Sequence, residues 1–155
     1  MIFPTVNKIP AFVLEKLDIL FQLLKERKSE FERFAARVKD TQLRGTILSL
    51  AQEANQYAIE LFSQIQVMGG KIKEMQQEGI RLDNTLMIEE ENEILKSCEI
   101  SEKKMIVAYR NILNEPFLHE NLRKLIRNQL NGLTFAFMQL RLLNTSLSLH
   151  SSFHR

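Results

Sequence analysis

The stretch that decides the fold is residues 41–70, TQLRGTILSLAQEANQYAIELFSQIQVMGG. Its apolar residues recur at alternating steps of three and four, which is the spacing of one face of an α-helix. Asp40 precedes the stretch and suits an N-cap, because its carboxylate can accept a hydrogen bond from a first-turn amide. Gly69 and Gly70 close the stretch, so we predict a helix over residues 41–68. The inward stripe of this helix is Leu43, Ile47, Leu50, Ala54, Tyr57, Leu61, Ile65 and Met68.

The same spacing continues on both sides of this stretch and predicts three more helices. They cover residues 11–39, 87–113 and 116–146. The chain has only five Gly and three Pro, and it is rich in residues that favour helix. Its 155 residues suit a single domain. We therefore expect an all-α fold, with one domain over residues 1–146 and a flexible, Ser-rich tail over residues 147–155.

The predicted connections differ in length. Almost nothing joins the first two helices around Asp40, and Asn114-Glu115 joins the last two. Short connections make antiparallel neighbours. Between the second and third helices lie the 18 residues of GKIKEMQQEGIRLDNTLM, enough to run along much of a bundle. Two antiparallel hairpins joined by one long crossover make the ferritin-like four-helix bundle.

Charge and composition narrow the class of protein. The formal net charge is +2, too small for the concentrated basic face of a nucleic-acid-binding domain. No run of about 18 apolar residues is present, so we expect no membrane span. Cys98 is the single cysteine, which excludes an internal disulfide and fits a reducing compartment. We therefore expect a cytoplasmic protein that binds neither nucleic acid nor membrane.

Four pieces of the chain carry a family resemblance: FERFAARVKDTQLRGTILSLAQE, VMGG, ILKSCEISEKKMIVAYRNIL and NLRKLIRNQLNGLTFAFMQLRLL. In this order and spacing they resemble a small bacterial family of ferritin-like four-helix-bundle proteins of unknown function, over about residues 17–143. The resemblance implies the ferritin-like fold and no established activity. Where the family often has an inward His late in its last helix, this chain has Phe137-Met138. That departure argues against a working metal centre.

Ferritin-like bundles hold two metal ions with carboxylates and Glu-x-x-His pairs. This chain has Glu53-Ala-Asn-Gln56 in its second helix, and His119, His150 and His154 fall at the start of the last helix or in the tail. We therefore expect no metal, no cofactor and no catalytic residue. The alternative is a carboxylate-only site for a hard cation. Its ligands would be Glu30, Glu53, Glu99 and Glu102.

Arg27 falls near the centre of the inward stripe of the first helix, at the depth where a metal would lie. A buried charge without a partner costs several kcal/mol, so we expect Arg27 to pair with an inward carboxylate. Glu102 is the expected partner, with Glu30 or Glu53 as the next candidates. In the alternative, Arg27 extends between the helices to solvent.

On the last helix, Phe135, Met138 and Leu142 share a line opposite the core stripe. The second helix adds Leu48, Ile59 and Phe62 off its own stripe. An apolar outer face indicates a partner, unless the linker or the tail covers it. We therefore expect a non-enzymatic bundle that acts through surface interactions or as a homo-oligomer, with a stress-related role among the candidates. The alternative is a ferritin-like metalloprotein that binds iron or manganese.

Overall fold

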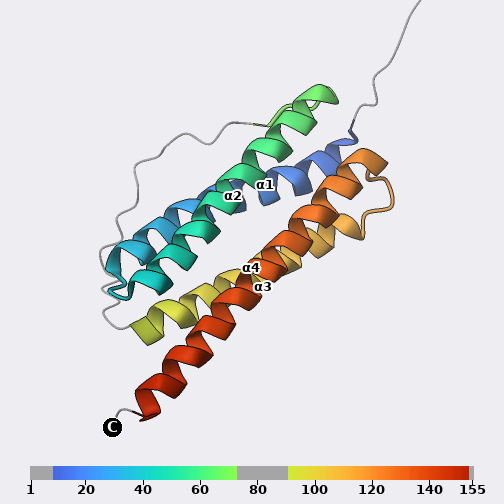
Figure 1. Cartoon of the computed structure of the whole chain (residues 1–155). Coiled ribbons are helices and arrows are strands. Elements are labelled where there is room, and N and C mark those ends of the chain that lie inside the picture. Colours follow the sequence, from blue (N-terminus) through green and yellow to red (C-terminus); the bar gives the residue numbers. More distant parts are fainter. Residues whose placement is uncertain (1–8, 73–90, 154–155) are drawn as a thin grey trace, which may run out of the picture.

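The computed structural model describes residues 9–72 and 91–153, with side chains up to residue 145. This part of the chain folds into α-helices and contains no β-strand. The helices are α1 (Ala11–Arg37), α2 (Thr41–Val67), α3 (Glu91–Leu113) and α4 (Glu120–Phe153) (Figure 1). For these residues, the prediction of an all-α fold with four helices is confirmed.

The connection between α1 and α2, residues 38–40, is fixed from two sides. Asp40 is the N-cap of α2, as predicted, and its Oδ2 accepts a hydrogen bond from the Leu43 amide at 2.8 Å. The carboxylate of Glu91, the first residue of α3, accepts a hydrogen bond from the Lys39 amide at 2.9 Å. The start of α3 therefore lies against the connection that joins the first two helices.

The end of α2 uses glycine in the way that the sequence predicts. Gly69 has a φ of 83°, in the left-handed region that favours glycine. The Gly70 amide donates to the carbonyl oxygen of Ile65 at 2.9 Å. The same carbonyl oxygen also accepts from the Met68 amide at 3.1 Å, so the amides of the closing residues satisfy the last turn of the helix.

The start of α4 lies later than the sequence predicts. Residues 114–119 form a turn after α3, and the helix begins at Glu120. His119 Nδ1 accepts a hydrogen bond from the Asn121 amide at 3.1 Å and so supports the first turn. The Arg123 guanidinium donates to carbonyl oxygens at the end of α3 and in the turn. Because these contacts hold the turn, the helix does not extend back to residue 116.

Two other predicted segments lie at the limits of the described residues. α4 continues past its expected end at residue 146 to Phe153, so the backbone of most of the predicted tail, residues 147–155, is helical. The long crossover predicted between the second and third helices lies almost entirely within residues 73–90, outside the described part of the chain.

The four helices form a bundle in which α1 lies beside α2 and α3, and α4 also lies beside α2 and α3 (Figure 1). The predicted apolar stripes fill its centre. The largest fully buried side chains include Leu17, Phe31, Leu50, Tyr109 and Phe137. The rings of Phe31 and Phe137 lie 6.0 Å apart between centroids. Phe137 of α4 therefore makes an aromatic contact with α1 in the core.

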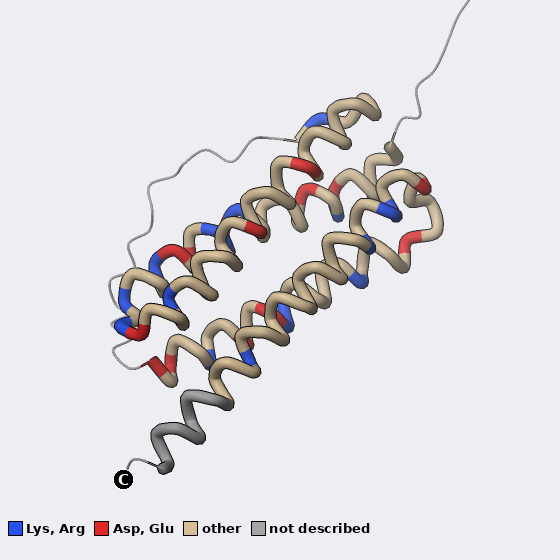
Figure 2. The backbone as a smooth tube through the Cα atoms, viewed as in Figure 1, with Lys and Arg blue, Asp and Glu red and all other residues tan. Residues whose placement is uncertain are grey.

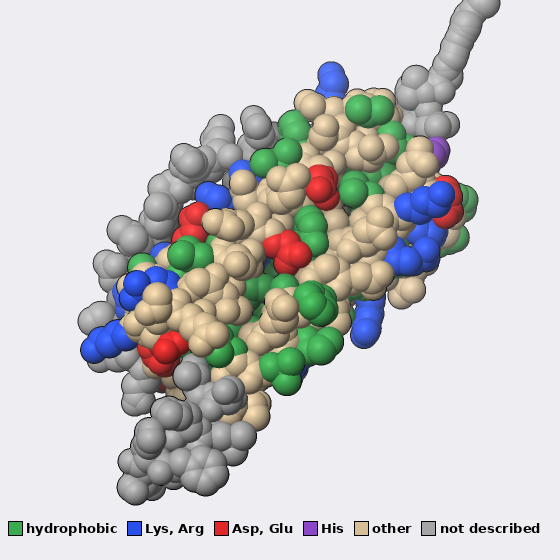
Figure 3. All heavy atoms as spheres, viewed as in Figure 1, with side chains coloured by type: hydrophobic (Ala, Val, Ile, Leu, Met, Phe, Trp, Pro, Cys, Tyr) green, Lys and Arg blue, Asp and Glu red, His purple; other side chains and the backbone are tan. Residues whose placement is uncertain are grey.

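The surface of the bundle is uneven in charge and polarity. α2 carries only three charged residues, Arg44, Glu53 and Glu60, whereas α1 is charged along its whole length (Figure 2). Hydrophobic side chains lie over both α2 and α4 on the face seen in Figure 3. We name five large exposed residues of these two helices the α2–α4 face: Leu48, Ile59, Phe135, Met138 and Leu142. None of the described helices is apolar over a length that would cross a membrane.

Candidate functional site

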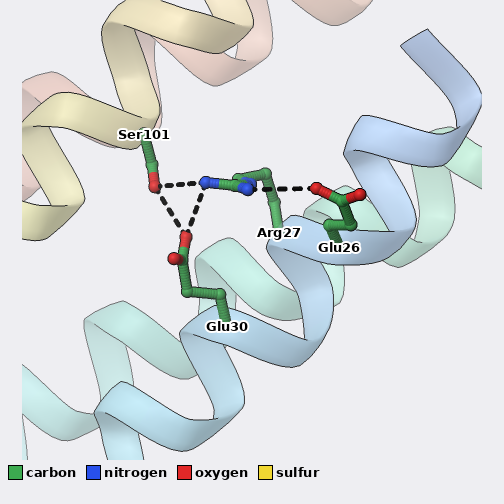
Figure 4. Close-up of polar contacts among 4 residues, drawn as sticks. All are labelled: Glu26, Arg27, Glu30 and Ser101. Atoms are coloured by element: carbon green, nitrogen blue, oxygen red, sulfur yellow. Dashed lines mark hydrogen bonds and ion pairs between the residues drawn. The ribbon is translucent and has the colours of Figure 1, made fainter. Parts of the chain in front are cut away.

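Arg27 lies in the interior, as predicted, between α1 and α3 (Figure 4). Its Nη1 lies 2.7 Å from Glu30 Oε1 and 2.9 Å from Ser101 Oγ. The Ser101 hydroxyl donates to the same Glu30 oxygen at 2.7 Å, which closes a triangle of contacts. Only 11% of the Arg27 side chain is exposed, and its Nη2 lies 3.3 Å from Oε1 of the exposed Glu26 (Figure 4). Most of the side chain therefore lies inside the bundle, while one guanidinium nitrogen reaches its edge.

The predicted pair of Arg27 and Glu102 does not form. Glu102 Oε1 instead lies 2.6 Å from Arg141 Nη1 of α4. Successive residues of a helix point about 100° apart. Because Ser101 faces α1, its neighbour Glu102 faces α4 and reaches Arg141 there. Neither Ser101 nor Arg141 is among the residues predicted from the sequence.

A second polar cluster lies at the seam between α2 and α4. The Tyr57 hydroxyl donates to Glu53 Oε2 at 2.7 Å. The Gln129 amide donates to Glu60 Oε1 and to the Tyr57 carbonyl oxygen, each at 3.1 Å, and it accepts from the Tyr109 hydroxyl at 2.8 Å. Burial raises the pKa of both tyrosines, so both hydroxyls remain protonated donors. The cluster holds α2 to α4 with neutral donors.

Gly132 makes room for this cluster. A Cβ at residue 132 would overlap the Tyr57 hydroxyl and would lie 3.2 Å from Glu53 Oε2. A larger residue in α4 would therefore displace the tyrosine ring and break its hydrogen bond to Glu53. The requirement here is for space, because no positive φ is found at this glycine.

The four carboxylates of the predicted metal site do not converge. Glu30 is held between α1 and α3, Glu53 at the seam of α2 and α4, and Glu102 against Arg141, while Glu99 is exposed. Within residues 9–72 and 91–145, no three His, Cys, Asp or Glu side chains are grouped closely enough to hold a metal ion. The carboxylate-only site expected as an alternative therefore has no geometric basis in the described residues.

Cys98 is fully buried in the core. Burial raises the pKa of its thiol to about 12, so the sulfur is protonated and not nucleophilic near neutral pH. The inward polar groups described above serve to connect helices.

No protein-family model matches this chain, and no curated protein matches it. The resemblance to the ferritin-like family therefore stays a prediction.

Replacing Arg27 tests the contact between α1 and α3. Arg27→Met should lower the free energy of unfolding by about 2 kcal/mol, because Glu30 would lose its cation in a largely buried place. Adding Glu30→Leu should recover much of this loss. Lys28→Met is the matched control, since Lys28 makes only a partly exposed pair with Glu32 at 3.6 Å. Urea unfolding would contradict this account if the Arg27 and Lys28 variants were equally stable.

Gly132→Ala should lower the free energy of unfolding by about 1 kcal/mol, although alanine favours helix by a similar amount over glycine. In a Tyr57→Phe background the same change should destabilise less, because the overlapping hydroxyl is gone and the remaining contacts lie at 3.2 and 3.3 Å. Gly45→Ala is the control: nothing lies within 4 Å of a Cβ there, so it should stabilise α2. Equal effects of Gly132→Ala in both backgrounds would show that Tyr57 does not need this space.

The pKa of Glu53 should make stability depend on pH. Burial raises this pKa above its ordinary value of 4.5, and the Tyr57 hydrogen bond offsets only part of the rise. Ionised Glu53 therefore destabilises the folded state above its folded pKa, and the penalty disappears below the unfolded pKa. The unfolding free energy of Glu53→Gln minus that of wild type should therefore be larger at about pH 7 than at about pH 3.5. An equal difference in unfolding free energy at both pH values would refute this assignment.

Proposed function

We propose that this protein is a non-enzymatic helical bundle that acts by binding another protein surface through the α2–α4 face. The observation that carries the proposal is the exposure of large apolar side chains on these two helices. Phe135 is 58% exposed, Leu142 65% and Ile59 53%. In Figure 3 hydrophobic side chains of both helices lie on one face, and soluble proteins seldom expose a contiguous apolar patch unless it is a binding site.

The interior supports the same proposal. Arg27, Glu102 and Gln129 each bind another residue of the chain, and the Cys98 thiol is protonated in the core. These groups therefore contribute to holding the helices together and are not available for chemistry on a substrate. A function at the surface needs only the rigid scaffold that such contacts provide.

The finer fold assignment is also part of the proposal. We infer two antiparallel hairpins with a long crossover, in the ferritin-like arrangement and in a cytoplasmic protein. The three-residue connection at 38–40 and the turn at 114–119 support the two hairpins. In this arrangement Arg27 and its partners take the place of a metal layer. The metalloprotein alternative has no supporting contact among the described residues. It would regain support if one metal ion per chain were lost in Glu102→Ala with the bundle intact.

Site-specific photo-crosslinking in cells that encode the protein tests the proposed surface. A photoreactive aromatic residue at Phe135 should give discrete covalent adducts, because this side chain would lie against the partner. Val107 of α3 is the matched control, since it is also 58% exposed but lies outside the α2–α4 face. Adding Leu142→Ser to the Phe135 probe should reduce the adducts.

The masses of the adducts separate two kinds of partner. An adduct of twice the mass of the chain would indicate self-association, and any other discrete mass would indicate a different protein. Equal labelling from residues 135 and 107, or labelling that ignores Leu142→Ser, would contradict the proposed surface.

A further inference from the structure

The inward carboxylates of the bundle fall into two groups. Three have a cation of this chain: Glu30 lies 2.7 Å from Arg27, Glu102 lies 2.6 Å from Arg141, and Glu115 lies 2.9 Å from Lys16. Glu53 and Glu60, at the seam of α2 and α4, have only neutral donors. Glu53 accepts a hydrogen bond from Tyr57, and Glu60 accepts hydrogen bonds from Gln129 and Gln56. Among the described residues, neither of these two carboxylates has a Lys or Arg within ion-pair distance.

The sequence around the seam explains why α2 and α4 place no cation beside these two carboxylates. Residues 45–70, which cover most of α2, contain no Lys, Arg or His, and neither do residues 128–140 of α4. Glu53 and Glu60 are the only charged residues in these two stretches. In Figure 3 acidic side chains lie among hydrophobic ones on this side of the molecule. The seam therefore carries two acidic residues on a face that has no other charge in these stretches and that includes hydrophobic side chains.

The two carboxylates have a defined spacing. They are seven residues apart on one helix, which places them on the same side of α2, two turns or roughly 10 Å apart. Both also contact α4: Glu60 accepts from Gln129, and Glu53 lies beside Gly132. The apolar side chains of α2 and α4 lie on the two sides of the line that joins the two carboxylates, with Ile59 on α2 and Phe135 on α4.

We propose that the α2–α4 face binds an amphipathic helix of another protein that presents two Lys or Arg residues seven positions apart, with apolar residues between them. The proposal rests on the proposed function and names the chemistry of the partner. Cations at positions i and i+7 of such a helix match the spacing of Glu53 and Glu60. Residues i+3 and i+4 lie on either side of that line, where they contact the apolar residues of α2 and α4.

Charge complementarity favours this partner over a second copy of the chain. A two-fold dimer through the same face would bring two copies of Glu53 and two of Glu60 into one interface. Like charges at an interface cost free energy unless cations separate them. The two cation-free stretches, residues 45–70 and 128–140, offer none. A basic partner helix gives each carboxylate the cation that Glu30, Glu102 and Glu115 find within the bundle.

The test uses the purified full-length chain and synthetic helical peptides, with binding measured by fluorescence anisotropy. The first peptide carries Lys at i and i+7 and Leu at i+3 and i+4. In the second, Glu replaces both Lys, and in the third, the Lys residues are moved to the opposite side of the helix. The first should bind best, and its affinity should fall with rising salt.

Variants of the protein test whether Glu53 and Glu60 are the residues that bind the peptide. Glu53→Gln with Glu60→Gln should weaken binding of the first peptide about tenfold, because two ion pairs are lost. Glutamine keeps an acceptor for Tyr57 and Gln129, so the bundle should stay folded, which circular dichroism checks. Glu93→Gln with Glu99→Gln is the control, because it removes the same charge from exposed positions of α3 and should leave the affinity unchanged.

Three other results would each contradict the proposed partner, the proposed surface or both. If Phe135→Ser abolishes binding but the seam variants do not, and the Glu peptide binds as well as the Lys peptide, the cationic partner is wrong and the proposed surface survives. If no peptide binds and sedimentation shows a dimer that Phe135→Ser dissociates, the occupant is a second copy of the chain. If Phe135→Ser changes neither binding nor sedimentation, both the partner and the surface are wrong.

Discussion

The structure depends on one constraint: a charge that is turned into a helical bundle must find a partner there. Arg27 meets this constraint with Glu30 and Ser101, and so ties α1 to α3. Glu102 meets it with Arg141 and ties α3 to α4. These contacts specify which helices are neighbours more narrowly than hydrophobic packing alone, because an ion pair fixes both the rotation and the height of two helices. At the seam of α2 and α4 the same role falls to tyrosine and amide groups, which bind the two carboxylates there without a Lys or Arg from the described residues.

The parts of the fold that the sequence predicts are those that depend on nearby residues. The inward stripes follow from the helical repeat, the Asp40 cap from a side chain that binds an amide three residues away, and the stop at Gly69 from its positive φ. The start of α4 was mispredicted because the Arg123 side chain, already within the helix, binds the preceding turn and holds it out of the helix. A contact of this kind cannot be predicted from the spacing of apolar residues.

The candidate site was predicted less completely, because contacts between helices depend on their relative height and rotation. Spacing along one helix placed Arg27 inward and included Glu30 among its candidate partners. It could not choose between Glu30 and Glu102, since that choice depends on how α3 is turned against α1 and α4. The predicted metal ligands are dispersed for the same reason: Glu30, Glu53 and Glu102 face different neighbouring helices, and Glu99 is exposed. The contact between Tyr57 and Gly132 had a weak signal, a glycine inside a helix.

The hydrogen bond from the Lys39 amide to Glu91 has a consequence for the way in which the two halves of the bundle are joined. It anchors the beginning of α3 to the connection between α1 and α2, so the fit of the two halves of the bundle is set by contacts between folded elements. Helix contacts between α1 and α3 and between α2 and α4 join the same two halves. The pairing of the α1–α2 half with the α3–α4 half therefore rests on noncovalent contacts as well as on the covalent connection between α2 and α3.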